Sequence, residues 1–285
     1  MSILLYLAIV TGSVSQSAAA KFFRCGGGST VAFNLLKSLA ALGLFALLCV
    51  GGCSFHADSA LYGAIYGVSL CLSMYAGYRA LCLGPMALTG LLVSFSVTIP
   101  VLYGLFWCGE EMSLYKWLGF PLFAAALILS GLPPRGEGAD AGKAHRSWLF
   151  YVGLTFVCNG ACSVLQKAHQ IRYPGAYCTE FMLSAMLVCC LLCGALAAIQ
   201  HKHFCVGGRR GAMSAGLSGI FNAVANYCTI RLAAAEDAAF LFPAVSVGTI
   251  CLSLLCGRVL FGERVRLPQL LSCLLGLVAI LLLKL

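Results

Sequence analysis

A chain of 285 residues in which 61% are hydrophobic and only 9% are charged cannot cover itself with the polar surface that a water-soluble domain needs. The formal net charge of +9 would suit a nucleic-acid-binding protein. Here, however, most basic residues stand at the ends of apolar stretches, where they anchor helices in a membrane. Composition and charge therefore exclude a soluble domain and argue against nucleic acid as a partner.

Charges and Gly/Pro clusters divide the chain into ten apolar segments. Most are close to the length that a helix needs to cross about 30 Å of hydrocarbon. Lipid offers no partner for backbone polar groups, so such segments must be helical. The sequence thus predicts an all-α integral membrane protein with ten transmembrane helices, which we expect in a bacterial plasma membrane. The predicted segments are 2–20, 30–51, 58–78, 86–107, 114–132, 148–170, 176–199, 211–232, 238–257 and 267–283.

The seventeen cysteines do not indicate a metal centre or a disulfide framework. Most lie inside apolar segments, where cysteine behaves as a small hydrophobe. The C-x-x-C formed by Cys190 and Cys193 lies in mid-segment, with no histidine or acidic residue beside it. We therefore expect no metal site.

Short motifs recur along the chain at a nearly constant offset, which indicates an internal repeat. RCGGGSTVAF at 24–33 corresponds to RYPGAYCTEF at 172–181, MYAGYRAL at 74–81 to NYCTIRLA at 226–233, and GEEMSL at 109–114 to GERVRL at 262–267. The predicted domains are a first five-helix repeat (1–132), a polar linker loop (133–147) and a second five-helix repeat (148–285). Because five crossings are an odd number, the second repeat must enter the membrane from the opposite face, so the two repeats are inverted.

Five plus five helices, with prolines in the fourth and ninth and a Gly-Glu turn after each, resemble the drug/metabolite transporter superfamily, EamA type. The second half carries the better match, at Pro243, Glu263, Gln269 and Gly276. The first half departs from the pattern, because Pro100 is not at the aligned position and Lys116 replaces the glutamine. The resemblance implies a central cavity, export or exchange of small metabolites, no cofactor, and energy from a proton or substrate gradient.

Polar side chains inside apolar segments are costly unless they are paired or face water, which makes them candidate functional residues. Asn222 and Asn226 are four residues apart and share a helical face, with Tyr227 beside them. They are either ligand-binding groups or hydrogen-bonding links between helices. Placement in matched helices of inverted halves favours binding. The candidate substrate-binding residues are Gln16, Asn159, Gln166, Asn222, Asn226 and Tyr227.

Four further residues inside the segments allow two interpretations each. Glu180 could couple transport to an ion or proton, or its charge could complement the N-terminus of its helix, which we favour. Lys37 could meet an anionic substrate or extend its amino group to the membrane interface, and we favour the interface. Pro100 and Pro243 are predicted helix breaks that either expose polar backbone at a site or simply bend packed helices.

The predicted function is secondary active transport, with export or exchange of small metabolites or drug-like compounds by alternating access between the inverted repeats. The alternatives are a passive channel or facilitator and a non-transporting scaffold. An enzyme is not expected, because the nine acidic residues are scattered and the histidines lie mostly in loops. The expected partners are a small-molecule substrate and the lipid bilayer, and a homodimer is left open. The loop charges predict termini outside the cytoplasm, whereas the resembled family implies termini inside.

Overall fold

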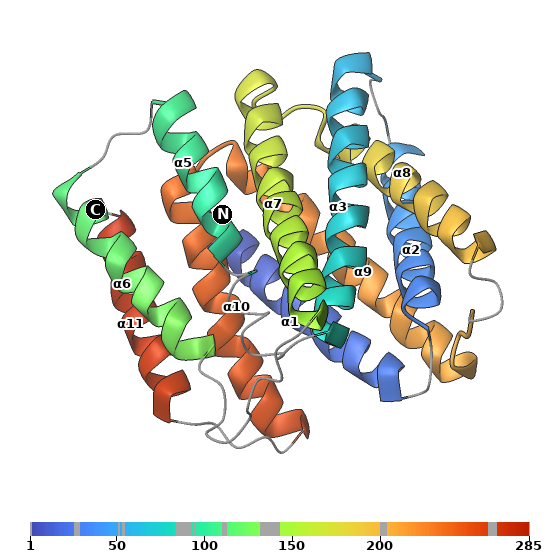
Figure 1. Cartoon of the computed structure of the whole chain (residues 1–285). Coiled ribbons are helices and arrows are strands. Elements are labelled where there is room, and N and C mark those ends of the chain that lie inside the picture. Colours follow the sequence, from blue (N-terminus) through green and yellow to red (C-terminus); the bar gives the residue numbers. More distant parts are fainter. Residues whose placement is uncertain are drawn as a thin grey trace. The chain divides into compact units, whose positions relative to one another are not determined.

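The computed structural model describes residues 2–25, 29–50, 52, 55–83, 93, 95–109, 113–131, 143–199, 204–261 and 267–284. Within these ranges it contains ten α-helices, one short 3-10 helix and no strand (Figure 1). The helices are α1 (Ser2–Cys25), α2 (Thr30–Val50), α3 (Ala57–Leu83), α5 (Thr98–Trp107), α6 (Leu114–Gly131), α7 (Lys143–Arg172), α8 (Cys178–Ile199), α9 (Gly208–Ala233), α10 (Ala238–Phe261) and α11 (Leu267–Lys284), with the 3-10 helix η1 at Phe95–Val97.

The helices follow the predicted apolar segments closely, which confirms the all-helical fold. Among the described helices with fully described ends, the largest differences are at the carboxyl ends of α1 and α3 and at the amino end of α7, where segments that contain basic residues extend the helix beyond the predicted apolar run. Residues 143–147 of the predicted linker are therefore helical. The rest of the predicted linker, residues 133–142, lies outside the described residues. So do Glu110, Glu263 and most of the predicted start of the fourth helix.

Five of the described helical segments are long and apolar enough to cross a membrane, which is the composition of a multi-pass membrane protein. They are Thr30–Val50, Ala57–Gly77, Arg146–Arg172, Cys178–Ile199 and Ala238–Cys256, and shorter apolar helices occur at Ile3–Ala19, Phe95–Trp107, Leu114–Leu129 and Leu270–Leu283. The long helix α9 falls in neither group. Its arginines at 209 and 210, its two asparagines and its many small residues lower its hydropathy. Ten crossings therefore stay a prediction.

The chain forms two compact units, and each combines two separate parts of the sequence. Unit 1 comprises residues 1–71 and 165–235, and unit 2 comprises residues 72–164 and 236–285. The divisions fall inside α3 and α7, so each of these helices contributes to both units. Neither unit coincides with one predicted half of the chain.

In unit 1, α9 packs along α1 and α2, and α2 also packs against α8. The amino-terminal part of α3 approaches α8 through two glycines. A Cβ at Gly63 would overlap the Phe181 carbonyl and the Ser184 hydroxyl, and a Cβ at Gly67 would overlap the Ala185 carbonyl. Small residues allow such close approach between membrane helices. These glycines therefore fix how closely α3 and α8 pack.

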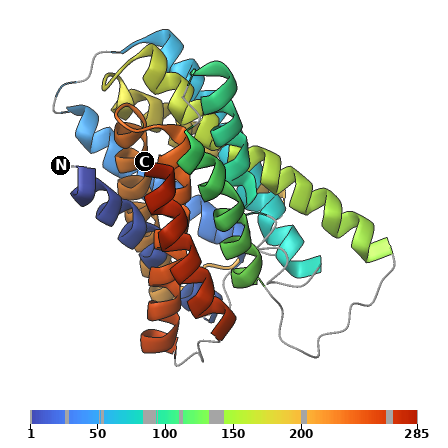
Figure 2. The ribbon, with the colours of Figure 1, turned by 90° about the vertical axis from the view of Figure 1, so that its left-hand side faces the viewer.

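In unit 2, α6 and α11 lie side by side in Figure 1 and again in the turned view of Figure 2. The Ser272 hydroxyl on α11 donates to the Ala126 carbonyl on α6 at 2.6 Å. The α10 helix packs against α5 and α11, with Val247 in a core that includes Phe123, Leu127 and Ala279. This hydrophobic core joins helices from both predicted halves of the chain.

The predicted helix breaks occupy different positions in their helices. Pro100 is the third residue of α5, directly after η1, and a proline in a first turn removes no intrahelical hydrogen bond. Pro243 lies inside α10, which continues on both sides of it. At the other end of α5, Gly109 has a φ of +67°, the left-handed conformation with which glycine commonly ends helices. This conformation accounts for the glycine of the first Gly-Glu turn.

Candidate functional site

A tyrosine and a glutamine connect α3, α7 and α9 inside unit 1. The Tyr66 hydroxyl donates to Asn226 Oδ1 at 2.7 Å and accepts from Gln166 Nε2 at 3.4 Å. Tyr66 is 2% exposed and Gln166 is 3% exposed, so both side chains are buried. Three helices that are far apart in sequence thus share one buried hydroxyl.

The same set of polar contacts continues from α9 to α1. Asn226 Nδ2 donates to the Asn222 carbonyl at 2.9 Å, and Asn222 Nδ2 donates to Gln16 Oε1 at 2.8 Å. The Ser218 hydroxyl donates to the Gln16 carbonyl at 3.4 Å. We call the connected side chains of Gln16, Tyr66, Gln166, Asn222 and Asn226 the amide chain.

The spacing of residues on α9 explains how the amide chain is assembled. Ser218, Asn222 and Asn226 follow one another at intervals of four and lie along one helical face. Small residues beside them let α1 approach closely. A Cβ at Gly12 of α1 would lie 3.1 Å from the Phe221 carbonyl oxygen and 3.2 Å from the Ala225 Cβ. Close packing therefore brings the Gln16 side chain within hydrogen-bonding distance of α9.

The amide chain keeps hydrogen-bonding capacity that no described residue uses. An amide side chain offers two N–H donors and an acceptor oxygen. Within the described residues, no hydrogen bond engages the Gln16 amide nitrogen, the Asn222 amide oxygen or the Gln166 amide oxygen. One donor group and two acceptors from three helices thus remain for a ligand that carries complementary polar groups.

The structure does not bring all the predicted binding residues into this chain. Asn159 belongs to unit 2, where its Nδ2 donates to the Ser96 hydroxyl at 2.7 Å. Tyr227 is in unit 1, but its ring lies 6.3 Å from the ring of Phe45 on α2, centroid to centroid. Gln16, Gln166, Asn222 and Asn226 are therefore the four candidates that meet.

Glu180 lies in the first turn of α8 and is 8% exposed. Its carboxylate is close enough to His169 and Cys178 to interact with both electrostatically. A negative charge in a first turn complements the helix macrodipole. The position fits the structural interpretation of Glu180 and leaves ion coupling as a prediction.

His169 is fully buried in a network that the sequence did not indicate. The Gly175 N–H donates to Gln170 Oε1 at 2.9 Å, which fixes the amide so that Gln170 Nε2 donates to His169 Nδ1, also at 2.9 Å. The other ring nitrogen, His169 Nε2, then donates to the Ser59 hydroxyl at 2.8 Å. Both ring nitrogens are engaged, so His169 links α3 to the turn between α7 and α8.

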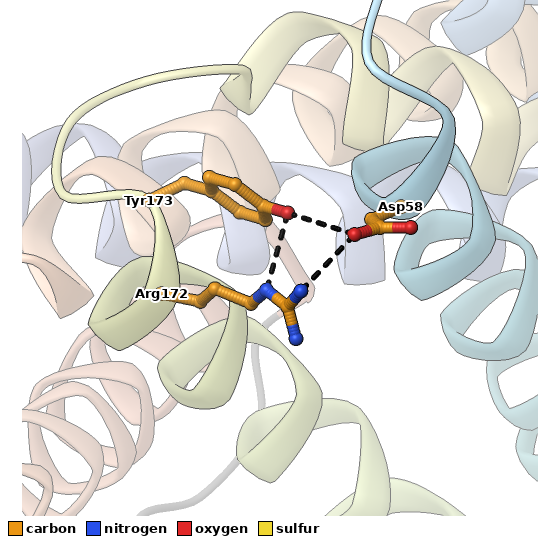
Figure 3. Close-up of polar contacts among 3 residues, drawn as sticks. All are labelled: Asp58, Arg172 and Tyr173. Atoms are coloured by element: carbon orange, nitrogen blue, oxygen red, sulfur yellow. Dashed lines mark hydrogen bonds and ion pairs between the residues drawn. The ribbon is translucent and has the colours of Figure 1, made fainter.

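An ion pair and aromatic contacts lie around the turn between α7 and α8. The Asp58 carboxylate accepts from Arg172 Nη2 at 3.1 Å and from the Tyr173 hydroxyl at 3.3 Å (Figure 3). Arg231 Nη1 donates to the Gly175 carbonyl at 3.2 Å. In unit 2, the corresponding Arg79 instead donates to Tyr75 at 3.2 Å. The repeated Tyr-Arg motif therefore makes different contacts in its two copies.

The expectation that Lys37 extends to the membrane interface is wrong. Lys37 is 4% exposed, and its side chain lies near the thiols of Cys189 and Cys193 on α8. The length of an apolar segment does not reveal which of its faces meets other helices, so this burial could not be predicted from hydropathy. Among the described residues, no group of three or more His, Cys, Asp or Glu side chains has the geometry of a metal site.

Comparisons with known proteins give a partial match in sequence and a solved structure with the same fold. No protein-family model matches the chain. A protein of Sinorhizobium sp., named as an uncharacterized transporter in the cobO 3′ region, is 33% identical over 69 residues. This match covers 24% of the present chain and 49% of the relative, so it spans about half of that protein's length.

A solved structure, described only as the crystal structure of a protein, has the same fold. The TM-score is 0.80 at 17% sequence identity, and the match covers 99% of this chain and 95% of the other. At this identity the similarity establishes the fold alone. The helical arrangement therefore has a counterpart of nearly equal length among solved structures.

Proposed function

We propose that this chain is a secondary active transporter that exports or exchanges small metabolites or drug-like compounds, and that the amide chain binds the substrate. The observation that carries the proposal is that four helices place connected polar side chains in the interior of unit 1, with donors and acceptors left over. The name of the Sinorhizobium relative supports transport as the class of activity. The EamA-type resemblance at Pro243 and Gly276 supports the same class.

The set of helices that makes up each unit supports the proposed inverted repeats. Unit 1 contains α1 and α2 of the first half and α8 and α9 of the second, together with parts of α3 and α7. Unit 2 contains α5 and α6 of the first half and α10 and α11 of the second. Two equivalent five-helix repeats would contribute matched helices in this way. The packed pairs α2 with α8 and α6 with α11 join matched positions of the halves.

In the proposed mechanism the protein binds a polar solute and changes which side of the membrane can reach it. Inverted repeats commonly place the substrate site near mid-membrane, and one bundle rocks against the other. Gln16, Gln166 and Asn222 would provide the donor and acceptor groups that hold the solute during this change. A proton or substrate gradient would supply the energy, in a bacterial plasma membrane.

Ligand-dependent stability tests the proposed binding site. We would measure thermal unfolding of the detergent-purified protein with amino acids, sugars, nucleotides, polyamines and cationic drugs. A ligand at 100 times its Kd adds about 2.7 kcal/mol of stability. We expect one chemical class to stabilise the protein, and Asn222→Ala or Asn226→Ala to abolish that effect.

Thr229→Ala is the matched control, because Thr229 lies on the same helix and donates only to the Ala225 carbonyl of its own helix, at 2.8 Å. This variant should respond to ligand as the parent protein does. If folded Asn222→Ala and Asn226→Ala proteins keep the full ligand response, the amide chain is not the binding site. If no class stabilises the parent protein, the amides are links between helices.

A further inference from the structure

Lys37 is a buried cation in the middle of unit 1. It lies seven residues after the first residue of α2 and is 4% exposed. Within the described residues its amino group forms no hydrogen bond and no ion pair. A buried charge without a partner is strongly unfavourable, so the site tolerates Lys37 only if an anion pairs with it or if it loses its proton.

The groups that interact electrostatically with the Lys37 amino group do not supply an anion. They are the thiols of Cys189 and Cys193 on α8. The Cys189 thiol donates to the Gly67 carbonyl at 3.2 Å, and the Cys193 sulfur lies 3.9 Å from that of Cys71. Glu180 is nine residues before Cys189 on α8, which is about 13 Å along the helix axis. The thiols are thus engaged elsewhere and the nearest acid on α8 is more than two turns away.

Contacts with α9 and α3 place Lys37 close to the amide chain. The backbone carbonyl of Lys37 packs so closely against Gly219 that a Cβ on Gly219 would overlap it. Gly219 lies one turn before Asn222 on α9. The thiol cluster beside the Lys37 side chain packs against Leu70, one turn after Tyr66 on α3. The positions of Gly219 on α9 and of Leu70 on α3 thus both place Lys37 about one helical turn from the amide chain.

From these relationships we infer that Lys37 binds the anionic group of the transported solute, while the amide chain binds the neutral polar part. This inference rests on the proposed function. A single ammonium suits a single negative charge, so the substrate class is small carboxylates, including zwitterions such as amino acids. The carboxylate supplies the counter-charge that the described residues near Lys37 do not.

The test compares carboxylates with their carboxamides, because the two differ in charge but little in shape. The probes are acetate and acetamide, lactate and lactamide, and amino acids with their amides, measured by thermal unfolding of the purified full chain. We expect a carboxylate to stabilise the parent protein more than its carboxamide does. Lys37→Met should weaken binding of that carboxylate about tenfold or more and leave carboxamide binding unchanged. Lys37→Arg should keep the preference for the acid.

The ligand-free stability of Lys37→Met provides a second measurement. Removing an unpaired buried charge should leave the Tm at or above that of the parent protein. A lower Tm would mean that Lys37 already has a structural partner and would overturn the inference. So would a carboxylate that binds Lys37→Met as tightly as it binds the parent protein, or a parent protein that never prefers the acid.

Failure of this inference is distinguishable from failure of the proposed function. If neutral solutes stabilise the parent protein as much as the matching acids do, and Asn222→Ala abolishes the effect, the substrate site stands and the anion site falls. If neither acids nor amides nor the wider set of solutes stabilises the parent protein, both fall.

Discussion

Asn222 Nδ2 donates to Gln16 Oε1 at 2.8 Å although the two residues are 206 positions apart in the chain. This contact joins α1 to α9 and belongs to the interior of unit 1. It links a side chain from each predicted half. If the amide chain is a substrate site, the two halves share that site.

The Gln16–Asn222 contact should be measurable as an energetic coupling. Interhelical hydrogen bonds in membrane proteins contribute about 0.6 kcal/mol on average and up to about 1.7. We expect Gln16→Ala and Asn222→Ala each to destabilise the protein and to be non-additive by about that amount. A double-mutant cycle from reversible unfolding in detergent measures it. Strict additivity of the two substitutions would show that the contact does not form.

Removing the Tyr66 hydroxyl should disconnect α3 and α7 from α9. Tyr66→Phe leaves Asn226 Oδ1 without its donor and Gln166 Nε2 without its acceptor. We expect a loss of about 1–3 kcal/mol in the free energy of unfolding, together with weaker ligand binding. Tyr62→Phe, one turn earlier on the same helix, is the control and should change stability little. Equal effects of the two substitutions would contradict the assigned role of Tyr66.

A methyl group added at Gly67 should force α3 and α8 apart. The new Cβ of Gly67→Ala would overlap the Ala185 carbonyl, which is backbone and cannot rotate away. Overpacking of this kind costs about 1–3 kcal/mol. Gly194→Ala on α8 is the control, since a Cβ there would meet nothing within 4 Å. Thermal unfolding of both variants measures the difference, and a tolerated Gly67→Ala would refute the close approach.

The exposed Asp58–Arg172 pair should contribute little to stability. The two side chains are 52% and 56% exposed, and exposed ion pairs are typically worth less than about 1 kcal/mol. We expect Asp58→Asn to lower stability slightly, with the difference shrinking as salt is added. Unfolding at low and high ionic strength checks this. A large, salt-independent loss would assign the pair a structural role that its exposure does not indicate.

Helix positions were predictable from the sequence because a membrane helix needs a long apolar run, and the ends of those runs are polar. The shared face of Asn222 and Asn226 followed from their spacing of four. The Gln16 contact was not predictable in detail, because hydropathy does not say which helices are neighbours. Tyr66 was overlooked because a tyrosine in an apolar run resembles ordinary core. Lys37 was misplaced because the same run has both lipid-facing and bundle-facing sides.

Solute counterflow in proteoliposomes tests the central claim, transport through the amide chain, most directly. Vesicles are loaded with an unlabelled solute that stabilises the protein, and entry of the labelled solute is followed. A carrier with alternating access predicts transient accumulation of label above equilibrium, retained in Thr229→Ala and lost in Asn222→Ala. Label that only equilibrates, without saturation, would contradict the account and indicate a passive channel. Accumulation that is unchanged in Asn222→Ala would place the transport site elsewhere.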